Sequence, residues 1–295
     1  MLIERKFAAR RRIAVSTALA AAGTALALPF AVSAQAAAAP ATAGIQNNVL
    51  TYDAADGQAN DLTVSVKIGA TDPDSTLPYY VFTLDDTVPI APGAGCALPD
   101  STDDTKVECD ILAPADEASY LTSLIVNLGD GDDSATVTDN SIAYTVINGG
   151  TGNDTITGHG RDVLYGNSGD DHVYGGGGVY AEGSFGGPGN DVLGECAYTC
   201  HGGPGADVIA GTDTGQRTDG LYGDGGDDTI YGNAGADHIY GGEDNDTLYG
   251  GTGDDFIYGN SGDDVIYGNS GNDSISGGPG MDWISGGTGD TTILS

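Results

Sequence analysis

Basic residues are scarce in this chain, and most of them lie at its start. The 295 residues contain 9 Lys and Arg against 43 Asp and Glu, which gives a formal net charge of −34. Outside residues 1–36 the basic side chains are Lys67, Lys106, Arg161 and Arg217. Because phosphate binding needs a basic surface, this composition excludes duplex nucleic acid as a partner.

Catalytic motifs are missing as well. Residues 44–126, which carry no repeat and could hold a catalytic module, contain no His, no HExxH and no GxSxG. The four histidines of the chain lie further on, and His172 and His238 are expected on exposed strand faces. The sequence therefore predicts a protein that is not an enzyme.

Cysteine is limited to four residues, which fits an oxidising compartment. Four cysteines allow three pairings. We favour Cys96–Cys109 and Cys196–Cys200, because each pair is local in the sequence.

Residues 1–36 have the pattern of a secretory signal peptide. Basic residues from Arg5 to Arg12 precede an apolar stretch at 13–32, and Ala-Gln-Ala at 34–36 is a suitable cleavage site. The alternative is an uncleaved anchor, since the stretch is barely long enough to cross a bilayer. We expect a secreted, extracellular protein with no membrane span after cleavage, exported by either the Sec or the twin-arginine route.

The C-terminal half repeats one nine-residue unit. From Gly223 it reads GDGGDDTIY, GNAGADHIY, GGEDNDTLY, GGTGDDFIY, GNSGDDVIY, GNSGNDSIS and GGPGMDWIS. Further copies begin at Gly149, Gly166, Gly186 and Gly202. Most copies follow Gly-Gly/Asn-x-Gly-x-Asp-x-U-x, where U is a large aliphatic residue. A period this strict predicts a solenoid.

Each position of the unit has a physical reason. Glycine at positions 1, 2 and 4 permits the positive φ angles of a tight turn, and Asn at position 2 tolerates them next best. Such a turn directs backbone carbonyls inward, and the Asp at position 6 adds a carboxylate. Oxygen ligands without sulfur or imidazole select Ca²⁺. Positions 7–9 form a short strand whose middle residue, U, points into the core.

Two units are expected to form one coil, so that units two apart stack as parallel strands about 4.8 Å apart. The position-6 aspartates then form two columns. One contains Asp228, Asp246, Asp264 and Asp282, and the other contains Asp237, Asp255 and Asp273. A Ca²⁺ between successive loops of a column would bind carboxylates from both loops.

The repeat resembles the RTX, or haemolysin-type, calcium-binding nonapeptide over roughly residues 127–295. The resemblance implies an all-β fold: a parallel β-roll, or right-handed solenoid, with several Ca²⁺ ions in its loops. The aspartates that would bind these ions are Asp133, Asp154, Asp162, Asp171, Asp191, Asp207, Asp219, Asp228, Asp237, Asp246, Asp255, Asp264, Asp273 and Asp282. Thr291 replaces this aspartate in the last repeat, so the final loop is expected to be degraded.

The remaining segments are assigned by their composition. An Ala-rich linker at 37–43 precedes a small N-terminal β cap at 44–126, with strands expected at 48–52, 62–68, 79–84, 106–111 and 121–128. An independent ligand-binding domain is the alternative for 44–126. Insertions at 175–185, 195–201 and 211–218 interrupt the repeat and are expected as loops on its flank.

Tyrosine at position 9 leaves two functions open. Tyr231, Tyr249 and Tyr267 are expected in one outward column, and Tyr222, Tyr240 and Tyr258 in a second column on the other sheet. If the tyrosines only stabilise the sheets, the protein is a calcium-binding structural or cell-surface protein. If they form a contact surface, it is a calcium-dependent adhesin that binds a cell-wall glycan or a surface protein.

Overall fold

The computed structural model describes residues 39–71, 77–113, 122–138, 142–176, 183–214 and 220–294. The predicted signal peptide at 1–36 lies outside these residues. In the part of the chain that is described, the regular elements are all strands, and no helix is long and apolar enough to cross a membrane. The predicted all-β class is confirmed.

The strands form two 13-stranded sheets, here named sheet A and sheet B. Sheet A contains β1 (Ala41–Gln46), β2 (Val49–Asp53), β5 (Ile90–Pro92), β8 (Leu124–Asp130), β10 (Thr145–Thr151), β12 (Val163–Ser168), β14 (Ser184–Phe185), β16 (Thr199–Pro204), β18 (Gly220–Gly225), β20 (His238–Glu243), β22 (Phe256–Ser261), β24 (Ser274–Ser276) and β26 (Thr292–Leu294). Sheet B contains β3 (Asp61–Thr71), β4 (Pro78–Asp85), β6 (Cys96–Ala97), β7 (Lys106–Leu112), β9 (Ser134–Thr138), β11 (Thr155–Thr157), β13 (His172–Tyr174), β15 (Val192–Cys196), β17 (Val208–Gly211), β19 (Thr229–Tyr231), β21 (Thr247–Thr252), β23 (Val265–Ser270) and β25 (Trp283–Ser285).

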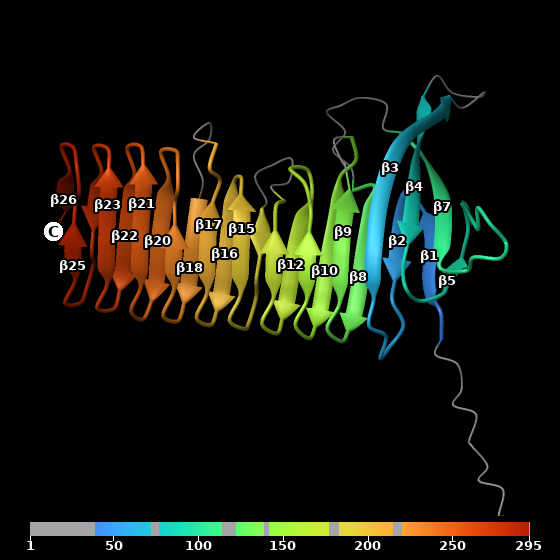
Figure 1. Cartoon of the computed structure of the whole chain (residues 1–295), viewed down its shortest axis with the longest axis horizontal. Coiled ribbons are helices and arrows are strands. Elements are labelled where there is room, and N and C mark those ends of the chain that lie inside the picture. The colour runs from blue at the N-terminus through green and yellow to red at the C-terminus, as the bar shows by residue number, and fades with distance from the viewer. Residues whose placement is uncertain are drawn as a thin grey trace, which may run out of the picture. The chain divides into compact units, whose positions relative to one another are not determined.

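From β8 onward the chain passes alternately between the two sheets. Each strand pairs in parallel with the strand one coil earlier and one coil later, as β20 does with β18 and β22. Figure 1 shows the coils following one another from β8 to β25 and β26. The expected parallel β-roll, with two strands per coil, is therefore confirmed.

The core is a ladder of U residues between the two sheets. Ile230, Leu248 and Ile266 of sheet B are fully buried, as are Ile239 and Ile257 of sheet A. Their neighbours at positions 7 and 9 lie on the outer face, because side chains alternate along a strand. The nonapeptide thus supplies one buried aliphatic side chain per strand.

The predicted cap is continuous with the roll. Strand β2 pairs in parallel with β8, and β3 pairs in parallel with β9, so both sheets run on without a break. The five strands expected in the cap are present. The sequence missed β1, β5 and β6, and β1 begins at Ala41, inside the segment expected to be a linker. Ala41 and Ala43 are buried there, so alanine in this segment fills the core.

The insertions are not simply flank loops, and this prediction was wrong in part. Ser184 and Phe185 form β14, and most of the second insertion belongs to β15 and β16. Residues 177–182 and 215–219 lie outside the described residues. Between β11 and β18 each nonapeptide supplies the sheet B strand, and the segments between nonapeptides supply the sheet A strand. A solenoid coil needs both strands, whatever sequence provides the second.

Both predicted disulfides are present. Cys96 and Cys109 are cross-strand partners on β6 and β7. Cys196 and Cys200 join β15 to β16 and are each 1% exposed, so this disulfide lies in the core. Cys200 pairs in register with Leu221 of β18, and it therefore occupies a U position.

Candidate metal centre

The loop conformation imposes different demands at each glycine position. Position 2 has a positive φ, for example 110° at Gly187, 68° at Asn233 and 74° at Asp224. Position 4 does too, with φ 120° at Gly226, where a Cβ would lie 1.9 Å from the carbonyl oxygen of Gly205 in the preceding coil. The expected positive φ is confirmed at these two positions.

At position 1 the predicted positive φ is not found. Glycine is needed there because a side chain would not fit. A Cβ on Gly223 would lie 2.2 Å from Oδ2 of Asp228 and 2.4 Å from the carbonyl oxygen of Gly241. A Cβ on Gly259 would lie 2.2 Å from Oδ2 of Asp264. The absent side chain keeps open a space bounded by a carboxylate oxygen and a carbonyl oxygen from the next coil.

The position-6 aspartates along one edge form a continuous hydrogen-bonded ladder, here named the long column. The backbone N–H of each aspartate donates to Oδ1 of the aspartate in the next coil, at 2.7–3.1 Å. The long column contains Asp133, Asp154, Asp171, Asp191, Asp207, Asp228, Asp246, Asp264 and Asp282. It lies where the chain passes from sheet A to sheet B.

The opposite edge carries a second ladder, here named the short column, of Asp237, Asp255 and Asp273. Among the described residues, this ladder joins nonapeptides of the uninterrupted run from Gly223. The two columns have the expected order, and the long column extends further toward the N-terminus than the expected set from Asp228. Their role as calcium ligands stays a prediction.

In ten of these aspartates the ladder uses one carboxylate oxygen, and the other is buried without a hydrogen bond. The Oδ2 atoms are buried and accept no hydrogen bond in Asp133, Asp154, Asp171, Asp191, Asp207, Asp228, Asp246, Asp255, Asp264 and Asp273. A buried carboxylate oxygen without a partner carries a large desolvation cost. The repetition of this arrangement in successive coils indicates that these oxygens have a ligand.

The donor set fits a hard cation. No group of three or more His, Cys, Asp and Glu side chains converges in the described part of the chain. Each loop instead has one buried carboxylate beside backbone carbonyls, such as Asp228 with the carbonyl of Gly241. Calcium takes carboxylate and backbone carbonyl oxygens together, whereas zinc prefers imidazole and thiolate. The loops therefore fit Ca²⁺.

The electrostatics of the columns favour a positive ion. Burial is the largest cause that raises the pKa of these carboxyls, and neighbouring carboxylates raise it further, whereas the backbone N–H donor lowers it. The pKa is raised to about 7 in Asp171, Asp191, Asp207, Asp228, Asp246 and Asp255. The pKa of Asp133 is raised to about 6. A bound cation would favour the ionised form and remove the repulsion along the column.

Two of the predicted positions differ from the columns, and a third is not described. Asp162 is fully buried before β12, where its Oδ2 accepts a hydrogen bond from the backbone N–H of His159 at 2.8 Å; it lies in neither ladder. Asp219 lies outside the described residues. At the last loop Thr291 donates its hydroxyl to the carbonyl of Gly286 at 3.3 Å, so no carboxylate extends the short column beyond Asp273.

The position-5 side chains form a further ladder, which is exposed and was not predicted from the sequence. The N–H of Asn245 donates to Asp227, that of Asp263 to Asn245, and that of Met281 to Asp263, at 2.8–2.9 Å. Its signal in the sequence is the preference for Asp and Asn at position 5. These carboxylates are exposed, so water competes for them.

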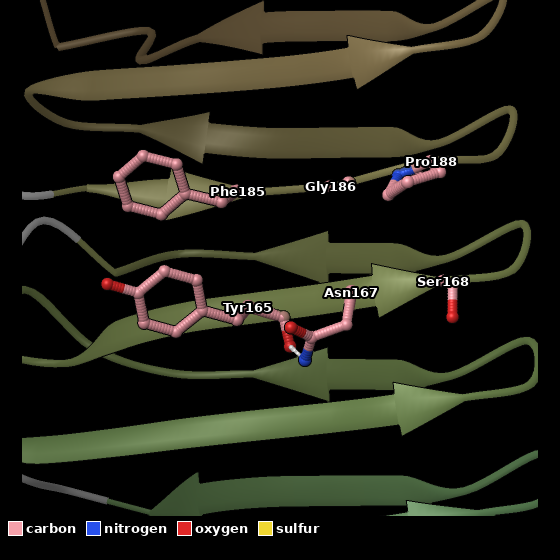
Figure 2. A pocket seen from close by; sticks show the side chains of 7 residues that line it. Tyr165, Asn167, Ser168, Phe185, Gly186 and Pro188 are labelled. Carbon is pink, nitrogen blue, oxygen red and sulfur yellow. Dashed lines mark hydrogen bonds between the residues drawn. The ribbon is translucent and has the colours of Figure 1, made fainter.

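Both aromatic columns are present, and the one on sheet A is longer than predicted. On sheet B, Tyr231, Tyr249 and Tyr267 stack with ring centroids 4.9–5.0 Å apart. On sheet A the stack runs through Tyr165, Phe185, His201, Tyr222, Tyr240 and Tyr258. The first three of these were not in the predicted column, which began at Tyr222, and only their strand register brings them into line. Figure 2 shows Tyr165 and Phe185 on neighbouring coils.

These observations define a parallel β-solenoid with columns of buried carboxylates in its turns. The family model of the RTX calcium-binding nonapeptide repeat matches four copies, at residues 145–160, 160–179, 222–257 and 258–293. The chain is an RTX-type repeat protein with a calcium-binding β-roll. No curated protein matches the chain significantly.

Proposed function

We propose that this protein is secreted, folds its repeat region around calcium ions and serves a structural role at the cell surface or in the extracellular matrix. The observation that carries the proposal is the long column, with its buried, unpartnered Oδ2 atoms. Extracellular calcium is plentiful enough to fill weak sites, which have dissociation constants of about 10⁻⁴–10⁻³ M. The signal-peptide pattern at 1–36 supports secretion.

The way in which the side chains are used supports a structural role. The U residues are buried, and the rings at position 9 stack along each sheet. The acidic surface also disfavours anionic partners. No module outside the repeats carries a catalytic motif, so we propose a non-enzymatic protein.

The test is calcium-dependent folding of the mature chain. Far-UV circular dichroism is recorded first in chelator and then with millimolar Ca²⁺ or Mg²⁺. We expect strand structure to appear with Ca²⁺ and to form poorly with Mg²⁺, because Mg²⁺ is smaller and demands octahedral geometry. A spectrum already rich in strand in chelator and unchanged by Ca²⁺ would refute the proposal.

A second candidate function is calcium-dependent binding of a glycan or protein. It is favoured by a shallow hollow of about 470 Å³ on sheet A, beside the stacked Tyr222 and Tyr240. Asp224, Glu243 and Asn260 also line it, and rings beside polar groups can recognise sugars. A similar hollow lies beside Tyr165 and Phe185 (Figure 2). A glycan array and a cell-wall pull-down, each with and without calcium, separate the two functions.

A further inference from the structure

The long column does not end at its first aspartate. The backbone N–H of Asn60, in the cap, donates to Oδ1 of Asp133 at 2.7 Å. This is the bond that joins each aspartate of the column to the next. The register agrees, because Leu62 pairs with Ala135 across β3 and β9. Asn60 therefore occupies position 6 of a coil that the cap supplies.

The loop before Asn60 also imitates a repeat. In the regular coils, a Cβ on the position-4 glycine would collide with the carbonyl oxygen of position 4 in the preceding coil. A Cβ on Gly152, for example, would lie 1.9 Å from the carbonyl oxygen of Gly131. A Cβ on Gly131 would meet the carbonyl oxygen of Gln58 at 2.6 Å. Gln58 thus presents its carbonyl where a repeat presents that of position 4, although residues 54–60 match no nonapeptide.

The side chain of Asn60 is held in one orientation by the cap. Its Nδ2 donates to the hydroxyl of Tyr52 at 2.7 Å and to Oδ2 of Asp86 at 2.8 Å. Asp86 also accepts the backbone N–H groups of Asp61 and Thr87. Because the carboxylate of Asp86 needs a donor, the amide cannot turn its oxygen toward it.

This arrangement leaves Oδ1 of Asn60 buried without a hydrogen-bond partner, in a residue only 3% exposed. The Oδ2 atoms of ten column aspartates are likewise buried and without a hydrogen-bond partner. An asparagine oxygen is an ordinary calcium ligand. A neutral side chain also suits this position, since a carboxylate at residue 60 would face that of Asp86.

We propose that Asn60 Oδ1 is a ligand of an additional Ca²⁺ at the junction of cap and roll, between the loops at 54–60 and 128–133. The carbonyl of Gln58 is the second ligand from the cap. This inference rests on the proposed calcium binding of the roll and goes beyond it, because neither Asn60 nor Gln58 belongs to a repeat. The ion would join the cap to the first coil.

The test counts calcium ions per chain in the full mature protein by native mass spectrometry, with thermal melting in calcium as a second measurement. Asn60→Ala removes the oxygen together with the Nδ2 contacts. Tyr52→Phe is the matched control, because it disturbs the same hydrogen-bond network and leaves the oxygen in place. The double variant Asn60→Asp/Asp86→Asn keeps an oxygen at the site and exchanges the amide and the carboxylate, so that an amide still faces a carboxylate.

We expect Asn60→Ala to bind one ion fewer than the wild type and Tyr52→Phe to bind the same number. Asn60→Asp/Asp86→Asn should bind the wild-type number. Equal counts for Asn60→Ala and the wild type would overturn the junction site while leaving calcium binding by the roll intact. A wild type without bound calcium would refute the proposed function itself. If Asn60→Ala loses most ions through misfolding, the double variant Asn60→Asp/Asp86→Asn decides, and a count one below the wild type would overturn the proposal.

Discussion

Two adjacent aspartates of one repeat provide a sharp test of the candidate sites. Asp264 belongs to the long column and is 1% exposed, with its Oδ2 unpartnered. Asp263 is exposed and accepts a hydrogen bond from the N–H of Met281 at 2.8 Å. Replacing either by Asn removes one negative charge and keeps an oxygen that can accept the backbone hydrogen bond. The two variants therefore differ mainly in whether a buried calcium ligand is lost.

The expected magnitude follows from the role of each oxygen. Losing even a group that supports a metal ligand typically costs about 10–100-fold in affinity, which is about 1.4–2.7 kcal/mol. In a folded unit of this size that corresponds to a melting temperature about 3–10 °C lower for Asp264→Asn. Asp263→Asn changes an exposed site and should stay within about 0.5 kcal/mol of the wild type.

The assay is thermal melting of the mature chain at a fixed millimolar calcium concentration, followed by circular dichroism, with the strand content in chelator as the comparison. In chelator, Asp264→Asn should contain at least as much strand as the wild type, because burial raises the pKa of this carboxyl and a neutral amide avoids burying a charge. Equal losses of melting temperature for both variants in calcium would show that position 6 is not the ligand position. A lower strand content for Asp264→Asn in chelator would show a role that does not depend on calcium.

Three further predictions test the loops, the pH response and the aromatic columns. Gly223→Ala should weaken calcium binding strongly in a calcium titration, because its Cβ would meet Asp228 and Gly241. Gly225→Ala is the control in the same loop: its Cβ meets nothing within 4 Å, and the titration should be unchanged. Similar titration curves for the two variants would contradict the role given to position 1. In calcium-free buffer, strand content should fall as the pH rises from about 4 to 7. Carboxyls whose folded pKa is raised to about 7 stabilise the folded state below their unfolded pKa, and they lose that contribution as they ionise. With calcium present, acidification over the same range should release calcium, and a strand content that increases with pH in the calcium-free protein would contradict the burial argument. Replacing Tyr231, Tyr249 and Tyr267 by Thr should lower the melting temperature modestly and leave calcium-dependent folding and any cell-wall binding intact, since Thr keeps strand propensity; loss of that binding in a folded variant would favour the adhesin.

The sequence determined the repeat, the strand positions and the order of the aspartate columns. A nine-residue period with Asp at position 6 and an aliphatic residue at position 8 fixes which face of the strand each side chain occupies, because side chains alternate along a strand. Asp228 and Asp246 are 18 residues apart, and that spacing alone put them in one column. Both disulfides followed from local pairing.

Only the tertiary structure decided what lies opposite each nonapeptide in the first coils. Phe185 and Cys200 belong to no repeat, yet the pairing of β14 and β16 places them in the aromatic column and in the core. The same holds for Asn60, which meets Asp133 across 73 residues of sequence. Such contacts depend on strand register between distant segments, and a local pattern carries no information about which strand will be the neighbour.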